Sequence, residues 1–155
     1  MASHSMDGAL LTQLIVELTR ARAQLDDVAQ VLADPSGLTA ARWHVLSAVS
    51  GAPAPAAQVA RAIGLTRQAV QQTADALEAE GLIQYRANPN HKRAKLIEAT
   101  AIGRQRLAAV EARQIAWANR LGKRLGRATL QSMSNGVRAL MAELSRDSAR
   151  RADKR

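Results

Sequence analysis

The sequence predicts a mainly α-helical protein that contains one short β-hairpin, and three observations support this fold class. Of the 155 residues, 47% are apolar but only 2% are aromatic, so the core must consist largely of Ala, Leu, Val and Ile, which suits closely packed helices. Long segments near both ends of the chain repeat their apolar residues every three or four positions, as amphipathic helices do. Only residues 82–99 have the composition of two strands joined by a turn.

Residues 8–36 are expected to form one long N-terminal helix. Its apolar positions alternate in steps of three and four, which is the heptad pattern of helices that pack against another long helix. A core-facing helix in a monomer is the alternative, but the strict pattern favours a role in dimerisation. The helix ends at the helix-breaking residues 34–37. The pattern comprises Leu11, Leu14, Leu18, Ala21, Leu25, Val28 and Leu32.

Three shorter helices are expected next. Thr39 is a good N-cap for a helix that runs to about Ser50, and residues 51–55 read as a loop with Pro55 in the first turn of the following helix. That helix, residues 56–63, is followed by Gly64, and Thr66 then caps a longer helix that Gly81 ends. A helix, a glycine-centred turn and a second helix form the helix-turn-helix plan.

The second of these two helices is polar on one face but nearly uncharged there. Ala69, Val70, Thr73, Ala74 and Leu77 share the apolar face. An ordinary solvated helix would carry more Lys and Glu on its outer face, whereas Gln and Arg can form paired hydrogen bonds with base edges in the major groove. We expect this face to read bases and Thr66 to meet a phosphate. The outer residues are Arg67, Gln68, Gln71 and Gln72, followed by Asp75.

Two strands are expected over residues 82–86 and 94–99, joined by a turn at residues 88–90. His91, Lys92 and Arg93 place positive charge at the tip of this hairpin. A basic hairpin directly after a helix-turn-helix is a wing, which would reach phosphates and the minor groove beside the second helix. Residues 37–100 are therefore predicted to be a winged helix-turn-helix DNA-binding domain.

Residues 101–148 are expected to form two further helices, which we assign to dimerisation. The first carries Leu107, Val110, Trp117 and Leu121 on one stripe. The second starts near Thr129 and has a wide apolar face, and residues 149–155 read as a basic tail. The apolar face consists of Leu130, Met133, Val137, Leu140, Met141 and Leu144.

Charge points to a polyanionic partner. The chain has 22 basic and 13 acidic residues, a net charge of +9, which is divided as −3 over residues 1–40, +3 over residues 41–100 and +9 over residues 101–155. A pI near 11.3 makes double-stranded DNA the first candidate. Solubility with a disordered basic tail is the alternative reading.

Several function classes are disfavoured. The chain has no cysteine, which excludes disulfides and thiol nucleophiles, and with three scattered histidines we expect no metal site and no cofactor. There is no nucleophile elbow, glycine-rich phosphate loop or close acidic pair, so an enzyme is not expected. Apolar runs are far shorter than the roughly 20 residues that cross a bilayer. We expect a cytoplasmic protein whose residues 1–7 are disordered or vector-derived.

The order of motifs resembles the MarR family of bacterial regulators over residues 8–148. The resemblance implies a winged helix-turn-helix on an obligate homodimer. Such a dimer binds a pseudo-palindromic operator, usually as a repressor, and a small aromatic anion often releases it from the DNA. The wing departs from the family's usual Asp-x-Arg, since His91, Lys92 and Arg93 occupy these positions. Before the last helical part, Ala99-Thr100 replaces the usual Leu-Thr. The matching segments are LTAARWHVL (38–46), QVARAIGLTRQAV (58–70), LEAEGLI (77–83), NP (88–89), RAK (93–95) and TAIG (100–103).

An effector site is the remaining expectation. The resemblance places effectors in a cleft between the DNA-binding and dimer parts, where Trp43, His44, Arg113 and Trp117 are candidates. The simpler interpretations are a core role for Trp43, an exposed position for His44, a solvated Arg113 and a dimer-core role for Trp117. A low-specificity architectural DNA-binding protein is the alternative function, but amide side chains on the outer helix face favour a sequence-specific regulator.

Overall fold

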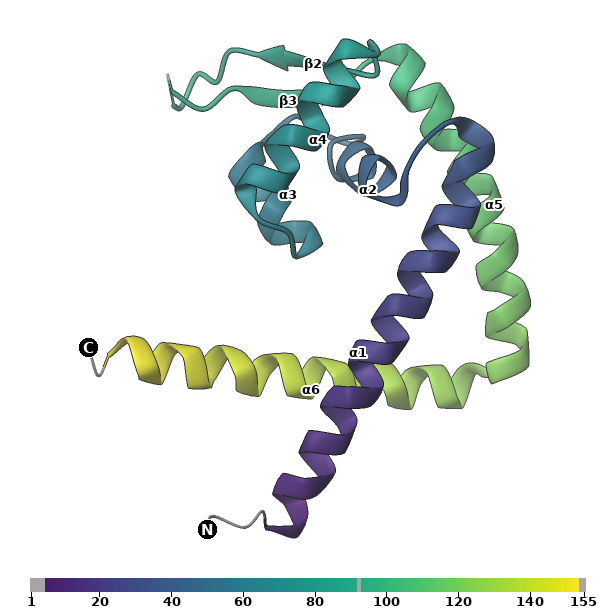
Figure 1. Ribbon diagram of the computed structural model, residues 1–155, viewed down its shortest axis with the longest axis vertical. Coiled ribbons are helices and arrows are strands. Elements are labelled where there is room, and N and C mark those ends of the chain that lie inside the picture. Colours follow the sequence, from purple (N-terminus) through teal and green to yellow (C-terminus); the bar gives the residue numbers. More distant parts are fainter. Residues whose placement is uncertain (1–4, 92, 154–155) are drawn as a thin grey trace. The chain divides into compact units, whose positions relative to one another are not determined.

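The computed structural model describes residues 5–91 and 93–153, which excludes Lys92 at the expected wing tip and the two extreme ends of the chain. The chain forms two compact units, one up to Arg113 and one from Gln114. None of the helices in the described part is long and apolar enough to cross a bilayer. A mainly α-helical fold with one small sheet confirms the predicted fold class (Figure 1).

The first unit begins with α1 (Met6–Ala33), two residues earlier than the sequence suggested, because the Ser5 side chain accepts a hydrogen bond from the Gly8 amide. A short 3-10 turn, η1 (Asp34–Ser36), leads to α2 (Ala40–Ala48), which Thr39 caps as predicted. The helix-turn-helix follows as α3 (Ala56–Ile63) and α4 (Arg67–Ala79). Gly64 between them has a φ of 70°, a left-handed conformation that suits glycine at a helix end.

The sheet has one strand more than the sequence predicted. Strands β2 (Ile83–Arg86) and β3 (Leu96–Ala99) form the expected antiparallel hairpin, with Ile83 opposite Ala99 and Arg86 opposite Leu96. Strand β1 (Ala54–Pro55), which we expected to be loop, pairs with the other side of β3 and gives the order β1-β3-β2. A two-residue strand is too short to show an alternating pattern, and its proline is tolerated because β1 lies at the sheet edge.

The core of the first unit joins the helix-turn-helix, the base of the hairpin and the start of α5 (Ala101–Leu125). Val45, Leu46, Val70, Leu77 and Leu82 are each fully buried, together with Ile97 and Val110. Figure 1 shows the β2–β3 hairpin extending outward from the region of α3 and α4. The wing and α4 therefore rest on one common core.

The start of α5 is bound tightly to the turn that precedes β2. The Thr100 hydroxyl donates to the Gly81 carbonyl at 2.7 Å, and it accepts a hydrogen bond from the Gly103 amide at 3.1 Å, as expected of an N-cap. A Cβ atom on Gly103 would lie 2.0 Å from the carbonyl oxygen of Leu82. The close approach of α5 to this turn thus depends on glycine at position 103.

The second unit contains the end of α5 and all of α6 (Arg127–Ala152), with Gly126 between them at a φ of 81°. Helix α6 starts two residues before the expected Thr129 and continues to Ala152, so part of the segment expected to be a basic tail is helical. Along α6, which lies wholly in the described part of the chain, no side chain is buried.

Candidate nucleic-acid interface

Helix α4 presents a polar face to solvent, as its sequence predicts. Val70, Ala74 and Leu77 are fully buried and hold the helix on the core. The Thr66 hydroxyl accepts a hydrogen bond from the Ala69 amide at 3.1 Å and so fixes the start of the helix. The predicted division of α4 into a buried and an exposed face is confirmed. The exposed side chains include Arg67, Gln68, Gln71 and Gln72.

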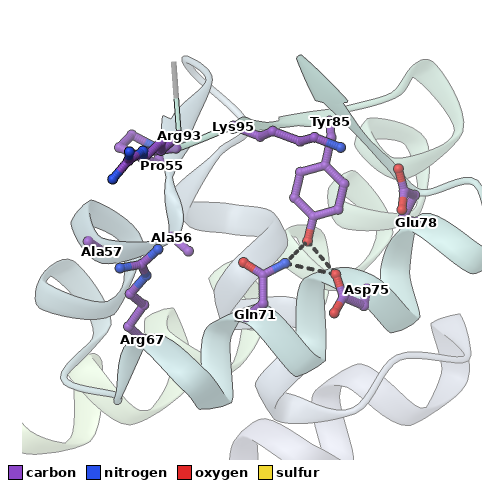
Figure 2. A pocket seen from close by; sticks show the side chains of 11 residues that line it. Pro55, Ala56, Ala57, Arg67, Gln71, Asp75, Glu78, Tyr85, Arg93 and Lys95 are labelled. Atoms are coloured by element: carbon purple, nitrogen blue, oxygen red, sulfur yellow. Dashed lines mark hydrogen bonds between the residues drawn. The ribbon is translucent and has the colours of Figure 1, made fainter. Parts of the chain in front are cut away.

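A cleft of about 470 Å³ lies between α4 and the wing. Arg67 and Gln71 of α4 line the cleft on the helix side, and Arg93 and Lys95 line it on the wing side. Figure 2 shows Arg67 and Arg93 at one end of the cleft and Asp75 and Glu78 at the other. The structure thus brings together two of the predicted DNA-contacting groups, one from the helix and one from the hairpin.

Three side chains in this cleft form a closed hydrogen-bonded triangle (Figure 2). The Gln71 amide nitrogen lies 2.8 Å from Asp75 Oδ1 and 2.6 Å from the Tyr85 hydroxyl. The Tyr85 hydroxyl donates to Asp75 Oδ1 at 2.6 Å. Helical spacing alone places Asp75 on the same face as Gln71, whereas nothing in the sequence marks Tyr85, because a strand tyrosine is an ordinary sheet residue until its partner is known.

Both ionisable groups of the triangle keep their ordinary charge at neutral pH. The hydrogen bond from Tyr85 lowers the pKa of the Asp75 carboxyl below its usual value, and the hydrogen bond from Gln71 lowers it further. Burial raises the pKa of the Tyr85 hydroxyl, and the hydrogen bond to Asp75 raises it further. Asp75 is therefore an acceptor only, and Tyr85 retains the proton that it donates.

The wing is stiffened by side chains across its strands. Glu98 of β3 accepts hydrogen bonds from Gln84 at 2.6 Å and from Arg86 at 3.0 Å, both of β2. The bond from Gln84 lowers the pKa of Glu98, so this residue stays ionised. At the turn, the Asn88 side chain accepts a hydrogen bond from the Asn90 amide at 3.0 Å. His91 and Arg93 are exposed near the tip, and Lys92 lies outside the described residues.

Comparison with known proteins agrees with this geometry. A model of the MarR family matches residues 36–94, which span α2, the helix-turn-helix and most of the wing. Two proteins, one from Mycobacterium bovis and one from Mycobacterium tuberculosis, are each 34% identical over 134 residues, covering 86% of this chain and 94% of theirs. The chain belongs to the MarR family. Its fold is thus that of a family of DNA-binding transcription regulators.

Solved structures of transcription regulators share this fold over most of its length. CouR, a transcriptional repressor bound to a 23-mer DNA duplex, is 25% identical with a TM-score of 0.72, covering 90% of this chain and 99% of that one. CouR from Rhodococcus jostii bound to p-coumaroyl-CoA has a TM-score of 0.70 at 24% identity, covering 79% and 87%. BldR from Sulfolobus solfataricus has a TM-score of 0.74 at 20% identity, covering 91% and 99%.

Two of the four residues considered for an effector, Trp43 and His44, lie side by side in this MarR-family chain. Trp43 is half-buried and packs against the core, and its ring centroid lies 5.5 Å from that of His44. His44 lines a hollow of about 400 Å³ together with Arg22 and Asp26. Trp117 belongs to the second unit, and its role stays a prediction.

Arg113 has a structural role that its position in the sequence does not indicate. Its Nε donates to the Leu32 carbonyl at 2.8 Å, and its Nη2 donates to the Ser36 hydroxyl at 2.6 Å. These bonds attach α5 to the end of α1 and to η1, where helix carbonyls need donors. The simpler interpretation of Arg113 as a solvated side chain is therefore corrected, because its guanidinium binds the chain itself, while its role toward an effector stays a prediction.

Replacing Arg113 by alanine is expected to lower the free energy of unfolding by about 2 kcal/mol, because a half-buried charged donor is lost from two acceptors. Urea unfolding followed by circular dichroism measures this change. The exposed Arg120 of the same helix provides the control, and Arg120→Ala should cost less than about 0.5 kcal/mol. Equal losses in the two variants would contradict the structural role of Arg113.

Proposed function

We propose that the chain is a sequence-specific transcriptional regulator that binds a pseudo-palindromic operator as a homodimer. The observation that carries this proposal is the cleft in which the exposed amide face of α4 adjoins Arg67 and Arg93. Helix α4 would enter the major groove, with Arg67, Gln68, Gln71 and Gln72 toward the bases and Thr66 near a phosphate. His91, Lys92 and Arg93 of the wing would reach the adjacent phosphates and minor groove.

Exposed apolar side chains support dimerisation through residues 8–36 and 101–148. A single chain leaves two long helices with apolar faces in water, which monomeric proteins usually avoid. A second copy would cover these faces, and such permanent interfaces are typically large and apolar. The exposed residues include Leu10, Leu11, Leu14, Ile15, Val16 and Leu25 of α1, and Leu130, Met133, Val137, Met141 and Leu144 of α6.

Repression and release by a small aromatic anion complete the proposal. The similar protein CouR is described as a repressor in its DNA complex, and it has also been solved with the aromatic thioester p-coumaroyl-CoA. In this chain His44, whose ring centroid lies 5.5 Å from that of Trp43, lines a hollow together with Arg22, which is ion-paired with Asp26. A ligand that binds better to the form unable to fit the operator would weaken DNA binding by the same linkage factor.

Replacing Arg93 by alanine is expected to weaken operator binding by about 1–3 kcal/mol and to reduce the salt dependence by about one phosphate contact. The physical reason is that Arg93 is exposed on the wing at the basic end of the cleft. Fluorescence anisotropy on a selected operator and on random DNA, over a range of salt concentrations, measures both effects. Arg20→Ala, which removes an exposed charge from α1, is the matched control.

The same titrations test the proposed function as a whole. The affinity of a specific regulator for its operator is roughly 10³-fold or more higher than its affinity for random DNA. A protein with similar affinity for both DNAs would be the low-specificity architectural protein that the basic composition also allows. Wild-type affinity in Arg93→Ala would show that Arg93 does not contact DNA.

A further inference from the structure

The direction of the Gln71 amide is determined by its neighbours. A glutamine side chain has a donor end and an acceptor end, and rotation by half a turn exchanges them. In this chain the nitrogen faces Asp75 Oδ1 and the Tyr85 hydroxyl at 2.8 and 2.6 Å. The opposite orientation would place the Gln71 oxygen against an ionised carboxylate that has no proton to share, so it is strongly disfavoured.

The same contacts leave the Gln71 carbonyl oxygen as the end presented to the cleft. Figure 2 shows the amide nitrogen directed at Tyr85 and Asp75 and the oxygen directed away from both. Gln71 is exposed, so this oxygen is accessible to a ligand in the cleft. A free glutamine can instead turn either end toward a base, or use both ends together on adenine.

We propose that Gln71 reads its base pair as a hydrogen-bond acceptor, with Asp75 and Tyr85 as the positioning residues that set this polarity. This inference rests on the proposed function, in which α4 enters the major groove. There, exocyclic amino groups of cytosine and adenine are donors, whereas O6 of guanine and O4 of thymine are acceptors. Each half-site should therefore hold cytosine or adenine opposite Gln71, and guanine or thymine on that strand should be rejected.

The positioning pair also ties base reading to the wing. Tyr85 is the third residue of β2, while Gln71 and Asp75 are one turn apart on α4. Lys95 of the wing lies with its ammonium 5.6 Å from the centre of the Tyr85 ring, which further restricts the ring. A shift of the hairpin relative to α4 would break the triangle, so the polarity of Gln71 depends on the wing position.

Selection of binding sites from a randomised duplex tests the reading role. Gln71→Ala identifies the position that Gln71 reads, because preference should vanish there alone. At that position the wild type should prefer cytosine or adenine, on the strand that Gln71 contacts, by about tenfold. Asp75→Asn keeps the size of the side chain but offers a donor as well as an acceptor, so it can meet either end of the Gln71 amide, and the preference should fall to about threefold or less. Arg20→Ala, which removes an exposed charge from α1, should leave this preference unchanged.

The outcomes separate this inference from the proposed function. Replacing the adenine or cytosine at this position by an analogue that lacks only the exocyclic amino group (purine for adenine, 2-pyrimidinone for cytosine) removes the donor without exchanging the strands, and unchanged wild-type affinity for that duplex would overturn the acceptor role. A full preference retained in Asp75→Asn would overturn the positioning role while leaving sequence-specific binding intact. A wild type that selects no sequence would overturn the proposed function and the reading role together.

A measurement without DNA tests the triangle itself. Tyr85 is the only tyrosine in the chain, so the ultraviolet absorbance of the phenolate reports on this residue alone. Burial and then Asp75 raise the pKa of Tyr85, so the wild type should ionise at higher pH than Asp75→Asn, in which the negative charge is absent. If the two proteins form phenolate at the same pH while circular dichroism shows that both are still folded, Asp75 does not hold Tyr85 and the inference is overturned.

Discussion

Replacing Gly103 by alanine is expected to destabilise the first unit more than any surface substitution. The added Cβ would lie 2.0 Å from the Leu82 carbonyl oxygen and 2.9 Å from its carbonyl carbon, both backbone atoms that no rotamer change can move. Helix α5 would have to withdraw from the turn, which would break the hydrogen bonds of Thr100 to Gly81 and Gly103. Overpacking typically lowers the free energy of unfolding by about 1–3 kcal/mol. Because this clash is with backbone atoms, we expect a loss of about 3 kcal/mol or more.

Thermal unfolding measures this effect. A loss of about 3 kcal/mol should lower the Tm by roughly 10 °C in a protein of this size. Gly136→Ala is the matched control, since nothing lies within 4 Å of its added Cβ and alanine favours a helix over glycine by about 1 kcal/mol. Equal Tm values for Gly103→Ala and the wild type would show that α5 does not approach this turn closely in solution.

Replacing Val137 by glutamate is expected to separate the proposed dimer. Val137 lies on the exposed apolar face of α6, with 43% of its surface accessible in the single chain. In a symmetric dimer the substitution occurs twice, and each new carboxylate would be buried in an apolar interface. A total cost of about 4 kcal/mol would raise the dimer dissociation constant by roughly a thousandfold.

Sedimentation velocity over a concentration series tests this prediction, and operator binding should weaken in parallel because two half-sites would no longer be held together. Gln131→Glu makes the same charge change on an exposed position of α6 outside the apolar face, and it should remain dimeric. If Val137→Glu sediments as the wild type does, α6 is not part of the interface. A folded wild-type monomer at micromolar concentration would refute dimerisation itself.

The local elements of this protein are readable from its sequence because local interactions determine them. Thr39, Thr66 and Thr100 accept amide hydrogen bonds three residues ahead, so each helix start is marked by a residue beside it. The buried face of α4 follows from the spacing of Val70, Ala74 and Leu77 alone. The hairpin is marked by its turn residues. Sequence therefore determined the winged helix-turn-helix and the side chains that α4 exposes.

Tertiary structure decided which groups work together. The orientation of Gln71 depends on Tyr85, which is 14 positions away and belongs to another element, and Arg113 meets Leu32 across 81 positions. The pairing of β1 with β3 and the approach of Gly103 to Leu82 are likewise contacts between distant segments. Periodicity and capping report only what neighbouring residues do, whereas these contacts arise when a shared core brings separate elements within hydrogen-bonding distance.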